Sequence, residues 1–247
     1  AVLAYLIAGL LAVPAMLSVA ELASALPKAG GAYYFLERAL GPSVGTVAGF
    51  GTWLSLVLKD AFALVGMSAY LVLVVDVDGR TAALVLIAVF TLLNVVGSKA
   101  SSSVQLVLVV FVLAVLGWFL VDGLVETTNR GFDGSNLDPF FTDGASGVVA
   151  VVGLVFVSYG GLTKVASAAE EVDDPSLRIP LGMGLSLVVG TALYTLGALV
   201  AVAVIPAEVL HEDLAPIHTA AEALLPPVGA ALVVIAALAA FASAVNA

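Results

Sequence analysis

The residues best able to do chemistry in this sequence stand together in FVSYGGLTK, residues 156–164. Ser158 and Tyr159 supply hydroxyl groups, and Gly160-Gly161 makes it easy to interrupt a helix, because glycine costs about 1 kcal/mol against alanine in a helix interior. Unwound N–H groups can bind an anion, and exposed carbonyls can meet an ammonium group. A break of this kind suits a site for a zwitterion. The simpler interpretation is that the small residues only let neighbouring helices pack closely.

The chain as a whole is far too apolar for an ordinary soluble protein. Its 247 residues are 62% hydrophobic and 11% charged, whereas soluble domains contain about 25% charged residues. A membrane-spanning helix needs about 20 apolar residues, and long apolar runs recur along the whole sequence. We predict seven spans, at residues 1–24, 43–75, 81–97, 101–122, 146–170, 179–205 and 227–247. The expected fold class is therefore all-α, a single polytopic membrane domain over residues 1–247.

The glycine pair lies near the centre of span 146–170. In lipid a free backbone group finds no water, so a helix is interrupted only where protein or a water-filled cavity surrounds the break. We therefore expect such surroundings at residues 158–161.

Both ends of the chain look truncated. Residue 1 already lies inside an apolar run, with neither an initiator Met nor the basic region of a signal peptide, and the run 227–247 stops without a polar flank. We expect the chain to be the middle of a longer protein. It contains no Cys, which removes disulfide, thiolate and Cys-type metal chemistry.

Basic residues near the span ends predict the orientation, because cytoplasmic loops retain Lys and Arg. The loops of one side carry Lys28, Arg38, Lys99 and Arg178, and those of the other side carry Arg80 and Arg130. Residue 1 is therefore expected outside and residue 247 inside the cell membrane. The net charge of −10 then lies largely on the external face, which argues against nucleic acid as a partner.

Two polar segments between spans have predictable forms. Residues 170–174 carry four acids before Pro175, which predicts a solvated cytoplasmic loop. Residues 205–227 have Pro at both ends and periodic apolar positions between them, which predicts a short amphipathic helix outside the membrane.

A second candidate for chemistry is Lys59, which lies with Asp60 about halfway along span 43–75. An ionisable group at that depth costs at least about 2.5 kcal/mol on insertion scales. Neighbouring residues point about 100° apart on a helix, so the two cannot form a simple pair with each other. We hypothesise that Lys59 faces an internal cavity as a fixed or titrating cation. The alternative is a structural ion pair with another partner.

Two long patterns resemble the amino acid permeases of the amino acid–polyamine–organocation transporter superfamily. They are SVAELASALPKAGGAYYFLERALG (18–41) and FVSYGGLTKVASAAEEVDDPSLRIP (156–180). In that family the first pattern closes the second transmembrane helix and forms the next cytoplasmic loop, and the second pattern is the broken sixth helix with its exit. The 247 residues would correspond to helices two to eight of a fold that usually has twelve.

The resemblance implies a partial LeuT-type fold of inverted repeats, in which broken helices one and six hold the substrate at the membrane's midplane. Five residues would bind the substrate: Phe156, Ser158, Tyr159, Gly160 and Gly161. Backbone groups would face its amine, and aromatic rings its side chain. The helix-one half of the site should precede residue 1. The implied function is that of a secondary active permease that moves amino acids by alternating access.

The coupling ion implied by the family is a proton or sodium, and no cofactor or resident metal is expected. Proton-coupled relatives can carry a Lys in helix five, at a position that is Val112 here. Lys59 is therefore the candidate for coupling in this chain. Ser243 stands where sodium-coupled members of the wider fold place a hydroxyl ligand.

Other functional classes are less favoured by the sequence. An enzyme would need a convergent nucleophile, base or metal set, and the predicted spans contain neither His nor Cys, so we do not expect an enzyme. A channel would need a continuous polar pore lining. Two alternatives stay open: a transport-inactive sensor or structural protein of the same fold, and a permease for polyamines or other organic cations.

Overall fold

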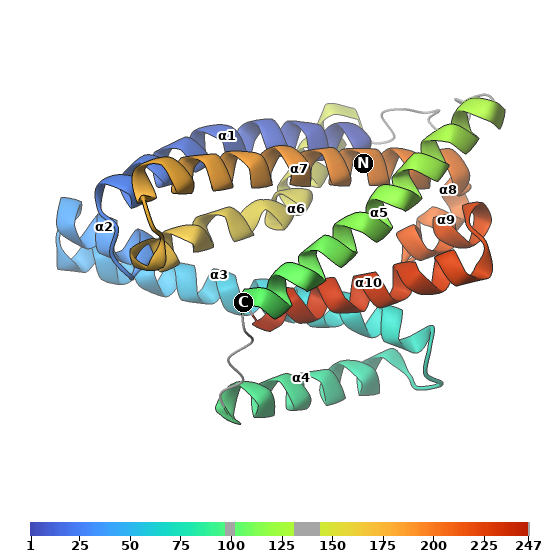
Figure 1. Cartoon of the computed structure of the whole chain (residues 1–247), viewed down its shortest axis with the longest axis horizontal. Helices are drawn as coiled ribbons and strands as arrows, with labels where there is room; N and C mark the ends of the chain where they lie inside the picture. Colours follow the sequence, from blue (N-terminus) through green and yellow to red (C-terminus); the bar gives the residue numbers. More distant parts are fainter. Residues whose placement is uncertain (97–101, 131–143, 247) are drawn as a thin grey trace. The chain divides into compact units, whose positions relative to one another are not determined.

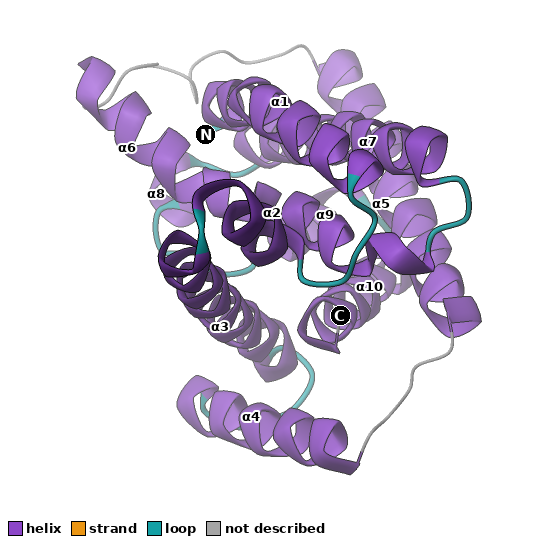
Figure 2. Cartoon of the chain, turned by 90° about the vertical axis from the view of Figure 1, so that its left-hand side faces the viewer, coloured by secondary structure: helices purple, strands orange, loops and turns teal. Residues whose placement is uncertain are grey.

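The computed structural model describes the chain except residues 97–101, 131–143 and 247 (Figure 1). The described residues form helices and loops and contain no strand, which confirms the all-α prediction (Figure 2). The elements are α1 (Val2–Ala25), α2 (Gly31–Leu40), α3 (Pro42–Val72), α4 (Gly79–Val96), α5 (Ser102–Arg130), α6 (Gly144–Phe156), the 3₁₀ helix η2 (Val157–Glu171), α7 (Pro175–Val204), α8 (Ala207–Leu210), α9 (Pro216–Leu224) and α10 (Pro227–Asn246). Lys99, one of the basic residues that predict the orientation, lies outside the described residues.

Within the described ranges, six helical stretches are long and apolar enough to cross a membrane: Val2–Ala25, Pro42–Val72, Gln105–Asn129, Gly144–Glu171, Pro175–Val204 and Pro227–Val245. The remaining predicted run, 81–97, falls on α4, whose apolar part Gly79–Leu92 is shorter than any of these six stretches. Large apolar side chains such as Leu10 and Val47 are 63% and 74% exposed, as suits contact with lipid rather than water. The protein is a multi-pass membrane protein.

The chain forms two compact units. Unit 1 comprises Ala1–Lys59 with Pro139–Ala198, and unit 2 comprises Asp60–Asp138 with Leu199–Ala247. The division falls inside α3 and α7. The single membrane domain expected from the sequence stays a prediction.

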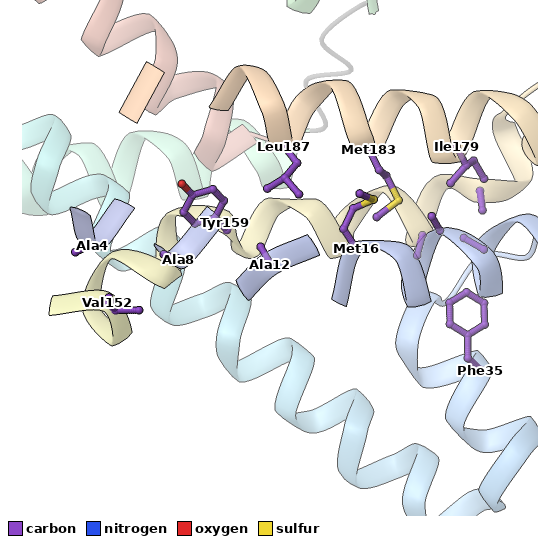
Figure 3. Packing of buried hydrophobic residues seen from close by; sticks show 14 residues of the cluster. Ala4, Ala8, Ala12, Met16, Phe35, Val152, Tyr159, Ile179, Met183 and Leu187 are labelled. Carbon is purple, nitrogen blue, oxygen red and sulfur yellow. The ribbon is translucent and has the colours of Figure 1, made fainter. Parts of the chain in front are cut away.

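Unit 1 is organised around α1, whose buried face is built from small residues. Ala4, Ala8 and Ala12 follow one another at four-residue spacing and so share one face of the helix, where small side chains allow α6 and η2 to approach. The same cluster contains Met16 of α1 and takes side chains from four other elements (Figure 3): Phe35 of α2, Val152 of α6, Tyr159 of η2, and Ile179, Met183 and Leu187 of α7.

The turn between α1 and α2 needs glycine for conformation and for space. Gly30 and Gly31 have φ of +118° and +51°, values that favour glycine. A Cβ on Gly31 would lie 2.8 Å from the Ser167 Oγ, so α2 begins directly against η2. The family resemblance implied a loop here but not the helix that follows the turn.

Unit 2 packs α10 against α5 and α9. A Cβ on Gly123 of α5 would lie 2.6 Å from the Val200 Cγ1, which explains a glycine at that point. Before α4, hydrogen bonds from the Thr81 side chain and backbone hold the pKa of Asp78 below its ordinary value. Segment 205–227 forms two short helices, α8 and α9, where the sequence predicted one.

Candidate functional site

The fifth predicted span changes its helix type near its middle. Regular α-helix ends at Phe156, and the chain continues as the 3₁₀ helix η2 for fifteen residues, Val157–Glu171. A 3₁₀ helix bonds residues three apart instead of four, and runs longer than about four residues are uncommon. Where the bonding changes from four to three residues apart, one backbone carbonyl receives no N–H within the helix, or one N–H is shared between two carbonyls. The sequence predicted a break at residues 158–161; α-helical bonding ends beside that point, while the chain keeps a narrower helix instead of unwinding.

Tyrosines from three helices hold the chain at this change. Tyr159 is 6% exposed, and its hydroxyl donates a hydrogen bond to the Tyr5 backbone carbonyl of α1 at 2.9 Å. The Tyr194 hydroxyl of α7 lies 3.4 Å from the Ser158 carbonyl, a long hydrogen bond to the backbone of η2. The Tyr159 and Tyr194 rings meet edge to face at 5.5 Å, an arrangement that aromatic pairs prefer.

A cavity of about 480 Å³ opens beside this change of helix type, on the side of α3. Its nine lining residues are Ala48, Gly51, Thr52, Ser55, Leu56 and Lys59 from α3, and Phe156, Val157 and Gly160 from α6 and η2. All of them belong to unit 1. The volume falls within the range of about 300–1,000 Å³ that is usual for sites of small molecules.

The glycine pair is not explained by close helix packing within the described residues. A Cβ added to Gly160 or Gly161 would meet no atom within 4 Å outside its own helix turn. Gly160 instead lines the cavity, where the absence of a side chain brings the backbone to the cavity wall. The packing interpretation of this pair therefore gains no support from the structure.

The residues predicted to bind substrate face two directions. Phe156 and Gly160 line the cavity together with Lys59, which the sequence suggested as a cavity-facing cation. Ser158 and Tyr159 are engaged by other helices, because the Ser158 carbonyl accepts a hydrogen bond from the Tyr194 hydroxyl and the Tyr159 ring enters the buried cluster. Gly161 is exposed beside them. Their roles in binding stay predictions.

Ser243, the second predicted coupling residue, lies in α10 of unit 2. Its hydroxyl accepts a long hydrogen bond from Gln105 Nε2 of α5 at 3.4 Å. This bond joins two helices of the same unit. Its role in coupling stays a prediction.

The C-terminal end of η2 is bound to the turn between α1 and α2. The Ala29 backbone N–H donates a hydrogen bond to Glu170 Oε2 at 3.1 Å. The prediction of a loop at residues 170–174 is wrong for Glu170 and Glu171, which end the 3₁₀ helix, although both side chains are exposed as expected. Asp173 does lie in an exposed turn, where it pairs with Arg178 at 3.7 Å. The 3₁₀ helix thus has a lateral hydrogen bond at each end.

Four contributors to this site were not predicted. Thr52 and Ser55 could have been found, since their spacing of three and four residues from one another and from Lys59 places all three on one helix face. Tyr5 and Tyr194 gave no such signal. They are aromatic residues within apolar runs, and Tyr5 is 154 positions from the residue it binds.

Comparison with known proteins gives matches over most of the chain. The family model described as "Amino acid permease" matches residues 1–247. "Cationic amino acid transporter 4, vacuolar" of Arabidopsis thaliana is 31% identical over 235 residues, which cover 87% of this chain and 39% of that protein. "Branched-chain amino acid permease BcaP" of Bacillus subtilis is 28% identical over 225 residues, which cover 83% and 47%. The chain spans less than half of the length of these curated relatives.

Proposed function

Because the chain belongs to the amino acid permease family, we propose that the protein is a secondary active permease that moves amino acids across a membrane by alternating access. The relatives' names differ in substrate, cationic amino acids for the Arabidopsis protein and branched-chain amino acids for the Bacillus protein. The class of amino acid is therefore open at this level. The proposed location is the cell membrane, with residue 1 outside and residue 247 inside.

The observation that carries this proposal is the cavity of about 480 Å³ beside the end of α6. A helix can depart from regular α bonding at membrane depth where protein or a water-filled space surrounds the departure. Here the cavity adjoins Phe156 and Gly160, and Lys59 of α3 is also among its lining residues. A zwitterion finds in this arrangement a counter-charge for its carboxylate and backbone groups for its amine.

Within this proposal the predicted binding residues have two tasks. Phe156 lies against the apolar part of the substrate, and the backbone of Gly160 and Gly161 faces its charged groups. Ser158 and Tyr159 act by position, because their bonds to α1 and α7 hold the end of α6 in place.

Lys59 is the proposed coupling residue, and Ser243 is the proposed hydroxyl ligand should sodium be the coupling ion. The Lys59→Met variant of the full-length protein should bind substrate more weakly, and the net uptake that remains should lose its dependence on the proton gradient. The matched control is Lys164→Met, because Lys164 is a cation of η2 that does not line the cavity. Proton dependence unchanged in Lys59→Met would exclude the coupling role of Lys59.

The proposed function is tested by counterflow in proteoliposomes that contain the full-length protein. Labelled amino acids are offered singly to vesicles loaded with the same unlabelled compound, and saturable accumulation of at least one is expected. Accumulation should fall about tenfold or more in Phe156→Ala. Stabilisation of the protein by amino acids without any flux would contradict transport and favour a sensor.

A further inference from the structure

A second cavity lies within unit 2, where α9 meets the start of α10 and the turn that follows α3. Its volume is about 620 Å³, within the range of about 300–1,000 Å³ that is usual for sites of small molecules. The ten lining residues are Leu73, Val74, His218, Glu222, Leu225, Pro227, Ala230, Ala231, Val234 and Ile235. The proposed function uses none of them.

The floor of this cavity is buried and apolar. Leu225, Ala230 and Val234 are all buried, and Val234 belongs to a buried cluster together with Tyr70 of α3 and Ala215. Alanine, leucine and valine side chains offer no hydrogen bond. An occupant that reaches the floor therefore presents an apolar part to it.

The cavity lies where two membrane spans have their ends. The span Pro42–Val72 ends one residue before Leu73, and the span Pro227–Val245 begins at Pro227. Leu73 and Pro227 line the same cavity, so these two ends lie at one level of the membrane. Lipid head groups lie just beyond the apolar layer, which places them at this level.

The open side of the cavity is apolar too. Val74 and Ile235 line it and are exposed, although both side chains are large and apolar. In a multi-pass membrane protein such a surface suits contact with lipid rather than with water. An occupant can therefore enter from the bilayer.

The polar side chains of the lining are confined to α9. Glu222 Oε1 lies 3.7 Å from His218 Nε2, one helical turn away, and the Glu222 side chain is 62% exposed, so its carboxylate is accessible to a ligand. The imidazole is charged only when it is protonated, and none of the ten described lining residues is Lys or Arg. The polar end of the cavity therefore suits a cationic group better than an anionic one.

We propose that this cavity binds a phospholipid of the surrounding bilayer whose head group carries a primary ammonium. The ammonium donates hydrogen bonds to the Glu222 carboxylate, and the upper part of an acyl chain lies over Ala230 and Val234. Charge-assisted hydrogen bonds of this kind are roughly twice as strong as neutral ones. The inference goes beyond the proposed function and does not depend on it, because this cavity shares no residue with the one assigned to the transported amino acid.

The test uses two lipids with the same acyl chains and the same phosphate. The full-length protein in detergent micelles is exposed to phosphatidylethanolamine that carries a photoactivatable group near the top of one acyl chain, and the labelled peptides are identified by mass spectrometry. Labelling is expected at residues 227–235. Unlabelled phosphatidylethanolamine should displace it about two- to fivefold better than phosphatidylglycerol, which has no ammonium. Equal displacement by the two lipids, or labelling spread evenly over the exposed faces of all spans, would overturn the proposal.

Two variants, each with a control, assign the binding to this cavity. Glu222→Gln should abolish the preference between the two lipids, and Glu208→Gln, an acid of α8 that does not line the cavity, should keep it. Ala231 is exposed and lines the cavity, so Ala231→Phe should fill the space and abolish displaceable labelling. Val228→Phe is its control, because Val228 is an exposed residue of α10 outside the lining.

Should Ala231→Phe fail to fold, the lipid preference of the wild-type protein and of Glu222→Gln still decides. A full preference kept by Glu222→Gln, or displaceable labelling kept by a folded Ala231→Phe, would overturn the site. Neither result would touch the proposed function, since amino acid exchange is not measured in this test.

Discussion

Two neighbouring spans of unit 1 respond differently to helix-breaking residues. In α7, Pro180, Gly182 and Gly184 all lie within an α-helix that stays regular from Pro175 to Val204. In the preceding span, α-helical bonding ends at Phe156, several residues before the pair Gly160-Gly161. A Cβ at any of these four glycines would meet nothing within 4 Å beyond its own helix. Glycine permits a change of helix type in both spans, and something else decides where it occurs.

The difference lies in what holds the backbone from the side. The 3₁₀ helix η2 receives a hydrogen bond from Tyr194 at its start, sends one from Tyr159 to α1, and receives one from the Ala29 N–H at Glu170 near its end. These bonds connect η2 to two other helices and one turn, so its geometry is set by tertiary contacts. The following predictions test that reading, in order of decreasing expected effect.

The close approach of α1 to α7 should be the most sensitive point. A Cβ on Gly9 would lie 2.5 Å from the Thr191 Oγ1 and 2.6 Å from its Cγ2, and threonine is stiff at χ1. Gly9→Ala should therefore lower the free energy of unfolding by roughly 1–3 kcal/mol, measured by thermal unfolding in detergent. Gly182→Ala, which meets open space, should cost far less. Equal stability of the two variants would show that α7 does not depend on this approach.

The glycine pair of η2 should matter for transport more than for stability. Changing Gly160 and Gly161 together to Ala stabilises helix against unwound chain by about 1 kcal/mol for each residue, enough to disfavour by more than about tenfold any conformation of the transport cycle in which this segment unwinds. The counterflow rate should fall by about that factor without loss of thermal stability.

The matched control is the pair Gly182→Ala and Gly184→Ala in α7, which should leave the counterflow rate nearly unchanged. Loss of transport in both double variants would mean that small residues in these spans matter in general. In that case the contrast between η2 and α7 would disappear.

Removing one hydroxyl should loosen the start of η2. Tyr159→Phe keeps the buried ring but leaves the Tyr5 carbonyl without its 2.9 Å donor, which should cost about 1 kcal/mol of unfolding free energy. Tyr194→Phe should cost less, because its hydrogen bond is 3.4 Å long. Tyr34→Phe in α2 is the control for loss of a tyrosine hydroxyl from a ring that packs against the same buried cluster but is not bonded to the start of η2. A larger cost for Tyr194→Phe than for Tyr159→Phe would contradict the assignment.

The bond at the C-terminal end of η2 should have the smallest effect. Glu170→Gln keeps the shape of the side chain but removes its charge from the hydrogen bond to the Ala29 N–H, an exposed contact worth less than about 1 kcal/mol. Hydrogen exchange of the Ala29 amide should become a few times faster. Glu171→Gln is the control at the next position, and an equal acceleration in both variants would remove Glu170 from this role.

Much of the fold could be predicted because a lipid environment restricts the amino-acid composition of the segments that cross it. A span must be long and apolar, so the predicted runs fall on helices over their described residues. Boundaries were less accurate: α7 begins at Pro175 rather than residue 179, since proline is accepted in the first helical turn. The short helix α2 was missed, because it depends on the turn at Gly30-Gly31 packing against η2.

The sequence alone determined that this is a membrane protein, that it is all-α, and near which residues one helix loses regular α-helical bonding. Those properties depend on composition and on residues a few positions apart. The tertiary structure alone decided that Lys59 and Gly160 line one cavity while Tyr159 turns away to bind Tyr5, 154 positions distant. Local propensity carries no information about such partners, because they meet only when separate helices pack together.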